Sequence, residues 1–430
     1  MADTKVGSPA SASARGPWLV LGMLGLVYLV NFLDRQIFAV LQEEIRAALD
    51  LADWQLGLLG GTMFAIFYAT LGLPLAWIAD RTNRVRVIAA ACATWSVFTA
   101  LSGAATTFVH MALARIGVAS GEAGGVAPSY SVISDYFPPH RRALAIGVFS
   151  VGGPLGLMAG SLLGALIADA LGWRWAFVLL GLPGLALAAL LLVVVREPER
   201  GAMDVDTGPT TPSAALDAAK LIAGSPSLIL FTAAAAFISF AGYGLYQWVP
   251  SFLIRTQGMA LDQVGTLFAP IFLTGIIGSI AGGWLASRFG ARNSAAYGLV
   301  PAAAMLIAGP FLIAALMAPS AGASVLFLIV PTMLSYVWIG PTLAASQNLS
   351  NPATRASVVA IMGFFNNLIG FGLGPLFVGS ASSMLTPSLG SAEALRVSLI
   401  IGSATYFIGA ALFVAAGWAM RREAGARLVA

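Results

Sequence analysis

Four ionisable residues stand inside long apolar stretches of the sequence: Asp34, Arg35, Arg115 and Glu122. A charge held away from water is costly, so such residues are expected to face a protein interior or a wet cavity and to pair with one another. Carboxylates beside guanidinium groups in such a place can exchange protons or bind a charged ligand. We interpret the four as a site of proton coupling or substrate binding; the alternative is a static structural salt bridge.

Spacing limits how these groups can meet. Arg115 and Glu122 are seven residues apart, two helical turns, so on a helix they share a face and lie about 10 Å apart along the axis. The neighbours Asp34 and Arg35 diverge by roughly 100°. We expect Arg115 to pair with Asp34 or Glu122, while Arg35 is left open, pointing either to Glu43 or to the outer surface.

The elements that carry these residues are expected to be membrane helices. The chain has 430 residues, of which 59% are hydrophobic and only 9% are charged, a composition unlike that of soluble domains. Continuously apolar runs such as LALAALLLVVV, residues 185–195, predict helices rather than the alternating strands of a barrel. One cysteine, Cys92, and two isolated histidines, His110 and His140, indicate no disulfide framework, no metal site and no cofactor.

Apolar segments recur six times on each side of one polar stretch. We mark spans at 17–41, 54–79, 85–106, 108–136, 142–170, 174–195, 227–253, 262–286, 294–317, 322–349, 355–384 and 394–419. The predicted fold is therefore an all-α membrane protein with twelve transmembrane helices in two six-helix bundles. Its expected parts are a tail at 1–16, a bundle at 17–196, a linker at 197–225, a second bundle at 226–420 and a tail at 421–430.

The distribution of basic residues orients these spans. Most of the 22 Lys and Arg residues fall on one side of the predicted topology, and the other side holds only Arg46, Arg174, Arg255 and Arg396. An excess of basic residues marks the cytoplasmic side. We expect both termini in the cytoplasm of a bacterium and the protein in its inner membrane. Because the membrane orientation already explains the excess of basic residues, we expect no nucleic-acid partner.

A repeated loop relates the two halves. AWIADRTNRVR, residues 76–86, follows the second span, and GWLASRFGARN, residues 283–293, follows the eighth. The first loop resembles the signature Gly-x-x-x-Asp-Arg-x-Gly-Arg-Arg of the major facilitator superfamily: Asp80, Arg81 and Arg84 match it, whereas Ala76 and Asn83 replace its glycines. The resemblance implies two pseudo-symmetric bundles, transport by alternating access, and a bridge between the halves made by this loop when the cavity faces outward.

Within that superfamily the chain resembles the spinster family and its bacterial relatives most. The residues that carry this resemblance are Asn31 to Gln36, the variant loop at Asp80 to Arg84, Gly121-Glu122-Ala123 with Pro128, and Glu197-Pro198-x-Arg200-Gly201. Spinster proteins are implicated in moving lipids such as lysolipids and sphingosine phosphate. The resemblance therefore implies a lipid or small-molecule substrate. The proton is the expected coupling ion because a carboxylate held between a low-dielectric site and a guanidinium can change its protonation.

The second half contributes no clear intramembrane charge. Its candidate cavity residues are polar or aromatic, although each alone is more often a packing residue: Tyr243, Tyr246, Gln247, Trp248, Tyr336, Trp338, Gln347, Asn366 and Asn367. Charged residues in the first half and aromatic residues in the second suit an amphipathic anion. Its head group would bind at Arg115 or Arg35, and its apolar part would lie along the aromatic side chains. An organic-acid:proton symporter and a drug exporter are the rival interpretations, and a channel is less favoured because two homologous halves favour alternating access.

Charges near the expected cytoplasmic ends form a candidate inner gate, unless they only set the topology: Asp80, Arg81, Arg84, Asp135, Arg142 and Arg355. The periodic glycines Gly152, Gly156, Gly160 and Gly164 predict a face for close helix contact, serving either static packing or gating. No nucleophile and base stand at a recognisable spacing and no phosphate-binding loop is present, so we expect neither an enzyme nor an ATP-driven pump. We expect a monomer in the lipid bilayer.

Overall fold

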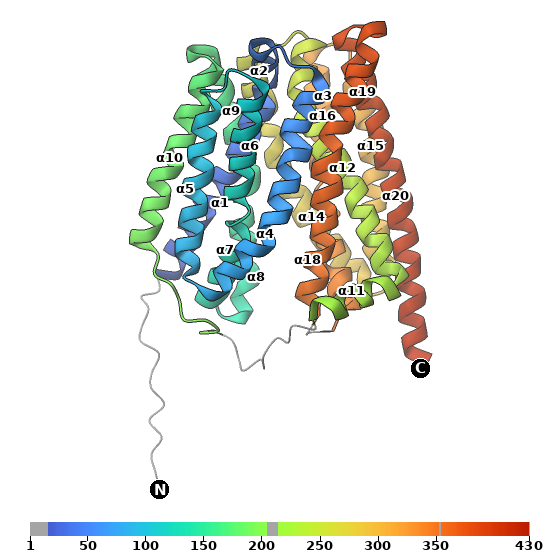
Figure 1. Cartoon of the computed structure of the whole chain (residues 1–430). Coiled ribbons are helices and arrows are strands. Elements are labelled where there is room, and N and C mark those ends of the chain that lie inside the picture. The colour runs from blue at the N-terminus through green and yellow to red at the C-terminus, as the bar shows by residue number, and fades with distance from the viewer. Residues whose placement is uncertain (1–15, 204–213, 352–353, 430) are drawn as a thin grey trace.

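The computed structural model describes residues 16–203, 214–351 and 354–429, and these ranges are built from helices. Two groups of helices stand side by side (Figure 1). The first group contains α1 (Gly16–Val40), α2 (Gln42–Leu49), α3 (Asp53–Gly57), η1 (Leu58–Thr62), α4 (Met63–Arg81), α5 (Arg84–Ser102), α6 (Phe108–Glu122), α7 (Val126–Tyr136), α8 (Pro139–Ser150), α9 (Gly152–Leu171) and α10 (Trp173–Val194).

The second group begins after the linker. It contains α11 (Ala214–Gly224), α12 (Pro226–Arg255), α13 (Leu261–Gln263), η2 (Val264–Phe268), η3 (Ala269–Leu273), α14 (Thr274–Gly290), α15 (Ala296–Leu316), α16 (Ala321–Leu334), α17 (Ile339–Leu349), α18 (Arg355–Phe365), η4 (Asn366–Leu373), α19 (Gly374–Leu389) and α20 (Ser391–Val429). The helix α11 lies inside the stretch expected to be a linker. The expected tail at residues 1–15, the linker residues 204–213 and Ala430 lie outside the described ranges.

Among the described residues, eleven helical stretches are long and apolar enough to cross a membrane. They correspond to the predicted spans except the fourth, 108–136, which is helical but not as one continuous helix. The chain instead forms α6 and α7, interrupted at Ala123–Gly125. Pro128 has no backbone N–H to bond the carbonyl of Gly124, and two adjacent glycines favour helix weakly, so the interruption has a local cause.

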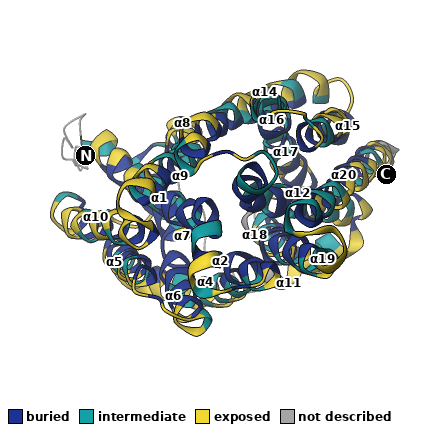
Figure 2. Ribbon diagram, turned by 90° about the horizontal axis from the view of Figure 1, so that it is seen from above, coloured by how far each residue is buried: buried dark blue, intermediate teal, exposed yellow. Residues whose placement is uncertain are grey.

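Exposed residues lie along the outer circumference, and buried residues gather where helices face one another (Figure 2). Many of the exposed residues are large and apolar. Val193 is 82% exposed, Met384 80% and Leu73 73%. Such a surface would be unfavourable in water but is matched to lipid chains. The exposure pattern therefore agrees with a protein whose perimeter contacts the bilayer.

The glycine face of α9 packs against α1. Backbone atoms of Leu29 and Leu33 occupy the positions that side chains at Gly156 and Gly160 would need. Small residues allow this approach, which is how helices associate where no hydrophobic effect drives them together. Both helices belong to the first half, so in this conformation these glycines serve packing within a half.

The hydrogen bonds between the halves gather at the end of the molecule that carries α2 and α3, which we call the closed end. There Thr62 Oγ1 donates to Gly372 O at 2.6 Å, and the backbone N–H of Trp54 donates to Ser383 Oγ at 3.0 Å. A side chain added at Gly61 would meet Pro375 of the second half. The opposite end, which carries α11, we call the linker end.

The long helix α20 is attached at the linker end through a carboxylate. Glu423 accepts hydrogen bonds from the side chains of Ser225 and Ser227 and from the backbone N–H of Ser227, at 2.8 to 3.0 Å. We expect Glu423→Ala to lower the free energy of unfolding by about 1–2 kcal/mol, because it removes the acceptor of the Ser227 N–H and of two serine hydroxyl groups at the start of α12. Unfolding by dodecyl sulfate, followed by tryptophan fluorescence, measures this.

The exposed neighbour Arg422 supplies the matched control for that substitution. Arg422→Ala should unfold as the wild type does. Equal stability of the two variants would contradict a capping role for Glu423.

Candidate functional site

The centre of the first half contains a buried ion pair between α1 and α6. Arg35 Nε lies 2.6 Å from Glu122 Oε2, and the two side chains are 12% and 0% exposed. Aromatic rings surround the guanidinium: those of Phe64 and Tyr68 have their centroids 4.9 and 5.0 Å from Arg35 Cζ. A ring face stabilises a cation, so Arg35 is neutralised by one carboxylate and supported by aromatic faces.

This pairing corrects the one inferred from the sequence. Glu122 pairs with Arg35 rather than with Arg115, and Arg35 points neither to Glu43 nor to the outer surface. Arg115 and Glu122 do share a helix face, but two turns separate them, whereas Arg35 approaches Glu122 from the neighbouring helix α1. Glu43 is bonded instead to Arg255 and Arg46.

The other two residues of the cluster lie close by. Asp34 is 1% exposed and accepts a hydrogen bond from Thr99 Oγ1 at 3.0 Å, so it turns toward α5 while Arg35 turns toward α6, as the predicted divergence requires. Arg115 is 2% exposed, and its Cζ lies 4.9 Å from the ring centroid of Phe38. The charges of Asp34 and Glu122 both act on Arg115.

Arg115 differs from Arg35 in having no carboxylate within 4.0 Å among the described residues. Its polar contact is with the carbonyl of Leu59, at 3.5 Å from Nε. A guanidinium has five N–H donors, and that of Arg115 is in contact with aromatic rings and one distant carbonyl. Most of its N–H groups therefore remain available to bond another acceptor. The structure thus brings the four predicted residues together and leaves Arg115 as the cation that an anion could approach.

A second charged cluster, at the closed end, joins the two halves. Arg255 of α12 donates from two nitrogens to both carboxylate oxygens of Asp53, at 2.8 Å each, and from Nε to Glu43 Oε2 at 2.8 Å. Ser382 of α19 donates to Asp53 Oδ2 at 2.6 Å. The Arg255 side chain is only 5% exposed, so this bidentate pair is shielded from water.

Sequence reasoning missed this cluster, which we call the closed-end latch. It counted Arg255 among the outer basic residues, considered Glu43 only as a possible contact of Arg35, and gave Asp53 no role. The available signal was weak: acids flank the first outer loop, and a basic residue ends the seventh span, on the same predicted side. Only the folded arrangement brings residues 202 and 212 positions apart together.

At the linker end, Arg84 and Asp135 of the predicted gate are paired, and Glu197 joins them with its Oε1 2.6 Å from Arg84 Nε. The same carboxylate accepts from the backbone N–H of Val85 at 3.0 Å. All these residues belong to the first half. This network therefore fastens the start of the linker to α5 and α7 and does not bridge the halves in this conformation.

The remaining gate candidates make local contacts. Arg81 lies over the Trp77 ring at 4.1 Å, and Asp80 is exposed. Arg142 donates to the carbonyls of Ser134 and Phe137, and Arg355 donates to that of Gln347. None of these hydrogen bonds connects the halves, so a gating role for these residues stays a prediction.

The aromatic and polar candidates of the second half fall into two groups. Tyr243 contacts Phe371, whose ring is 5.5 Å from Arg35 Cζ, so these two rings face the charged cluster. Gln247 and Trp248 are buried in packing at the closed end: Gln247 Nε2 donates to Gln42 Oε1 at 3.1 Å and Trp248 Nε1 to Pro375 O at 3.0 Å. The half-buried candidates away from that packing are Tyr246, Tyr336, Trp338, Asn366 and Asn367.

Comparison with known proteins agrees with this architecture. The sequence pattern of the Major Facilitator Superfamily matches residues 24–375. An MFS-type efflux pump of Mycolicibacterium smegmatis is 33% identical over 422 residues, covering 96% of each chain. The sphingosine-1-phosphate transporter SPNS2 of Danio rerio is 28% identical over 430 residues, 93% of this chain and 85% of that one.

A solved structure is similar over nearly its whole length. It is a bacterial homologue of the human lysosomal transporter spinster, in an inward-facing and unoccupied conformation, with a TM-score of 0.87 and 31% identity over 95% of this chain and 98% of that chain. The fold and the sequence thus define a membrane transporter and not an enzyme. The chain belongs to the Major Facilitator Superfamily. Within it the chain is spinster-like, and the resemblance read from its motifs is confirmed.

We expect the closed-end latch to keep water-soluble reagents away from the contact between the halves. Ser251, which is fully buried, accepts a hydrogen bond across the halves from Gln42 at 3.0 Å. In a Cys92→Ala background, which removes the single native cysteine, we expect Ser251→Cys to react slowly with a water-soluble maleimide. Adding Arg255→Ala should speed labelling by about tenfold or more, because it leaves the buried carboxylate of Asp53 without its cation.

Arg46→Ala is the matched control, since Arg46 pairs with Glu43 inside the first half at 3.2 Å. Labelling in this background should match that of the parent. If Arg255→Ala labels no faster than Arg46→Ala, the latch does not hold the closed end together.

Proposed function

We propose that this spinster-like protein is a proton-coupled secondary transporter that moves an amphipathic, lipid-like or organic anion by alternating access. The observation that carries the proposal is the buried pair of Arg35 and Glu122 beside Asp34 and Arg115. Protonation of Glu122 would remove its charge and release Arg35 from the pair. Since a buried cation left alone is unfavourable, proton binding and the arrangement of these helices become linked.

The surroundings of Arg115 support an anionic substrate. Arg115 is a buried cation with rings on its apolar sides and no carboxylate within 4.0 Å among the described residues. An anionic head group can occupy the donors of this guanidinium, while an apolar tail lies along the aromatic residues of the second half. The zebrafish relative is named a sphingosine-1-phosphate transporter, and sphingosine 1-phosphate is also an amphipathic anion.

Drug export is a second candidate. The mycobacterial relative is named an efflux pump, and the aromatic faces around the charged cluster, from Phe64, Tyr68 and Phe371, would also accept an aromatic cation. An organic-acid:proton symporter would use the same cluster, and a channel is disfavoured by the sealed contacts at the closed end.

We place the protein in the inner membrane of a bacterium as a monomer, with both termini and the linker end in the cytoplasm. The excess of Lys and Arg on the linker-end loops supports this orientation. The closed end then faces outward, which agrees with the similarity to an inward-facing structure.

Removal of the titratable groups tests the coupling. In proteoliposomes with an imposed pH gradient, we expect the wild type to carry radiolabelled sphingosine 1-phosphate or ethidium at a rate that depends on the gradient. Glu122→Gln should abolish that dependence, because the amide cannot bind and release a proton, and Asp34→Asn should weaken it. The exposed Asp169 supplies the control variant Asp169→Asn. Undiminished dependence in both cluster variants would refute a coupling role.

Head-group recognition is tested by binding. We expect Arg115→Ala to weaken the binding of sphingosine 1-phosphate by about tenfold to a hundredfold, since a charge-assisted hydrogen bond contributes about 1.5–3 kcal/mol. Binding of sphingosine, which lacks the phosphate, should change little. Isothermal titration of the purified protein measures both ligands, with the exposed Arg86→Ala as control. Unchanged affinity for both would exclude Arg115 as the anion contact.

A further inference from the structure

The linker end of the second half carries basic side chains that no nearby acid in the sequence balances. Between Asp262 and Glu393 the sequence contains no aspartate or glutamate, but it contains Arg288, Arg292 and Arg355. The helix α14 follows α12, which ends at the closed end with Arg255, so α14 runs back to the linker end and carries Arg288 there. This part of the surface therefore attracts anions.

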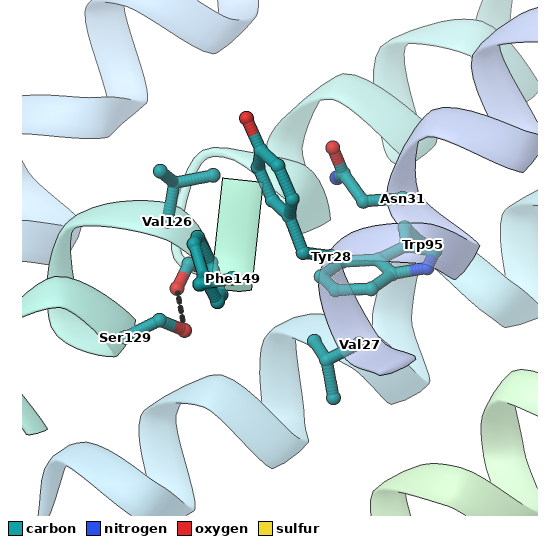
Figure 3. A pocket seen from close by; sticks show the side chains of 8 residues that line it. Val27, Tyr28, Asn31, Trp95, Val126, Ser129 and Phe149 are labelled. Atoms are coloured by element: carbon teal, nitrogen blue, oxygen red, sulfur yellow. Dashed lines mark hydrogen bonds between the residues drawn. The ribbon is translucent and has the colours of Figure 1, made fainter. Parts of the chain in front are cut away.

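The small cavity inside the first half has a different character (Figure 3). Its described lining residues include Tyr28, Asn31 and Phe149, and none of them is charged. An anion removed from water needs charged partners or several hydrogen-bond donors. The basic surface at the linker end therefore suits an anion better than this cavity does.

One face of α14 leads along the membrane to the basic surface. Ile277, Ile280 and Trp284 are 60%, 68% and 59% exposed, and Arg288 is exposed as well. The four residues follow one another at intervals of three or four, which places them on one side of the helix. Tryptophan and arginine are typical of the level at which hydrocarbon gives way to lipid head groups. Trp284 and Arg288 therefore mark the head-group level on α14.

The guanidinium group of Arg288 keeps its hydrogen-bond donors available at that level. Its Cζ atom lies 5.7 Å from the centroid of the Trp284 ring. Arg292 follows within one turn, where its backbone N–H donates to Phe289 O at 3.1 Å. Among the described residues, neither arginine side chain has a hydrogen-bond acceptor or a carboxylate partner. Both guanidinium groups can therefore bond phosphate oxygens.

The related loop of the first half repeats the pattern with a different charge. Leu73, Trp77 and Arg81 are exposed at intervals of four, and Arg81 Cζ lies 4.1 Å from the centroid of the Trp77 ring. The exposed Asp80 precedes that arginine, whereas Ser287 takes its place in the second half. A carboxylate at this position repels a phosphate. The loop of the second half is therefore the one suited to an anion.

We propose that Trp284, Arg288 and Arg292 bind the head group of an anionic phospholipid, such as phosphatidylglycerol, at the membrane surface of the linker end. The phosphate accepts hydrogen bonds from the two guanidinium groups, and the acyl chains lie along Ile277 and Ile280. Trp284 is a positioning residue that supports the guanidinium group of Arg288. The helix α14 lies at the edge of the molecule in Figure 2, and the site goes beyond the proposed transport and does not depend on it.

The test measures which lipid lies beside the site in the full-length protein. In a Cys92→Ala background, a fluorescent maleimide is attached at Ala291→Cys, an exposed position between the two arginines. The protein is placed in nanodiscs of phosphatidylcholine that contain a small fraction of nitroxide-labelled phosphatidylglycerol or nitroxide-labelled phosphatidylcholine. We expect labelled phosphatidylglycerol to quench more than an equal fraction of labelled phosphatidylcholine, and the ratio gives the preference of the site for the anionic lipid.

Substitutions within the site should lower this preference. We expect Arg288→Gln and Arg292→Gln each to reduce it by about fivefold, the effect of one basic residue at an anionic membrane surface. Ser287→Asp should also reduce it, because it restores the acid of the first loop. Trp284→Leu should reduce it, whereas Trp284→Phe, which keeps a ring beside the guanidinium group, should retain most of it.

Arg81→Gln is the matched control, since Arg81 occupies the related position of the first half. It should leave the preference measured at residue 291 unchanged. Equal quenching by the two labelled lipids, or an unchanged preference in both Arg288→Gln and Arg292→Gln, would overturn the proposal. An equal loss in Arg81→Gln would do the same, because it would show a general effect of surface charge instead of a site.

Discussion

The cost of holding charge away from water is the constraint on which this structure depends. The first half buries two carboxylates and two guanidinium groups, and each survives there because another group compensates it. Glu122 is neutralised by Arg35, Asp34 is hydrogen-bonded to Thr99, and Arg115 is supported by rings. The four charged side chains stabilise one another, so a change of charge at one of them changes the energy of burying the other three.

The same constraint explains why the two halves contribute different kinds of side chain to the cluster. Among the described residues, the second half brings no charged side chain to the cluster, but it supplies Phe371 and Tyr243 to its aromatic surroundings. Phe371 belongs to the η4 region, which is bonded to the first half through Thr62 and Gly372. Parting of the halves at the closed end would therefore also change the environment of Arg35.

Two charged networks act at opposite ends. The closed-end latch uses Arg255 to join the halves, whereas the network of Arg84, Asp135 and Glu197 stays within the first half and holds the linker's first residues. A transporter that alternates needs bonds between its halves at one end at a time. Among the described residues, the hydrogen bonds between the halves lie at the closed end.

The sequence by itself determined the membrane helices, the two related halves and the identity of the charged residues in the interior. These follow from local properties: apolar length, a repeated loop, and the rarity of charge within a span, which singles out Asp34, Arg35, Arg115 and Glu122 by residue type and position alone. The sequence also contains a local signal for the interruption at residues 123–125, namely two glycines followed by Pro128. The long apolar run outweighed this signal and favoured one continuous span.

Only the tertiary structure decided which charges meet. Helical spacing relates residues of one helix, so it favoured Arg115 as the partner of Glu122; the actual partner, Arg35, comes from a helix whose crossing no local pattern specifies. The contact of Arg255 with Asp53, 202 residues away, and the cavity beside Asn31 arise for the same reason. Pair distances between helices depend on how glycine faces such as that of α9 let backbones approach, and that is a property of the packed bundle.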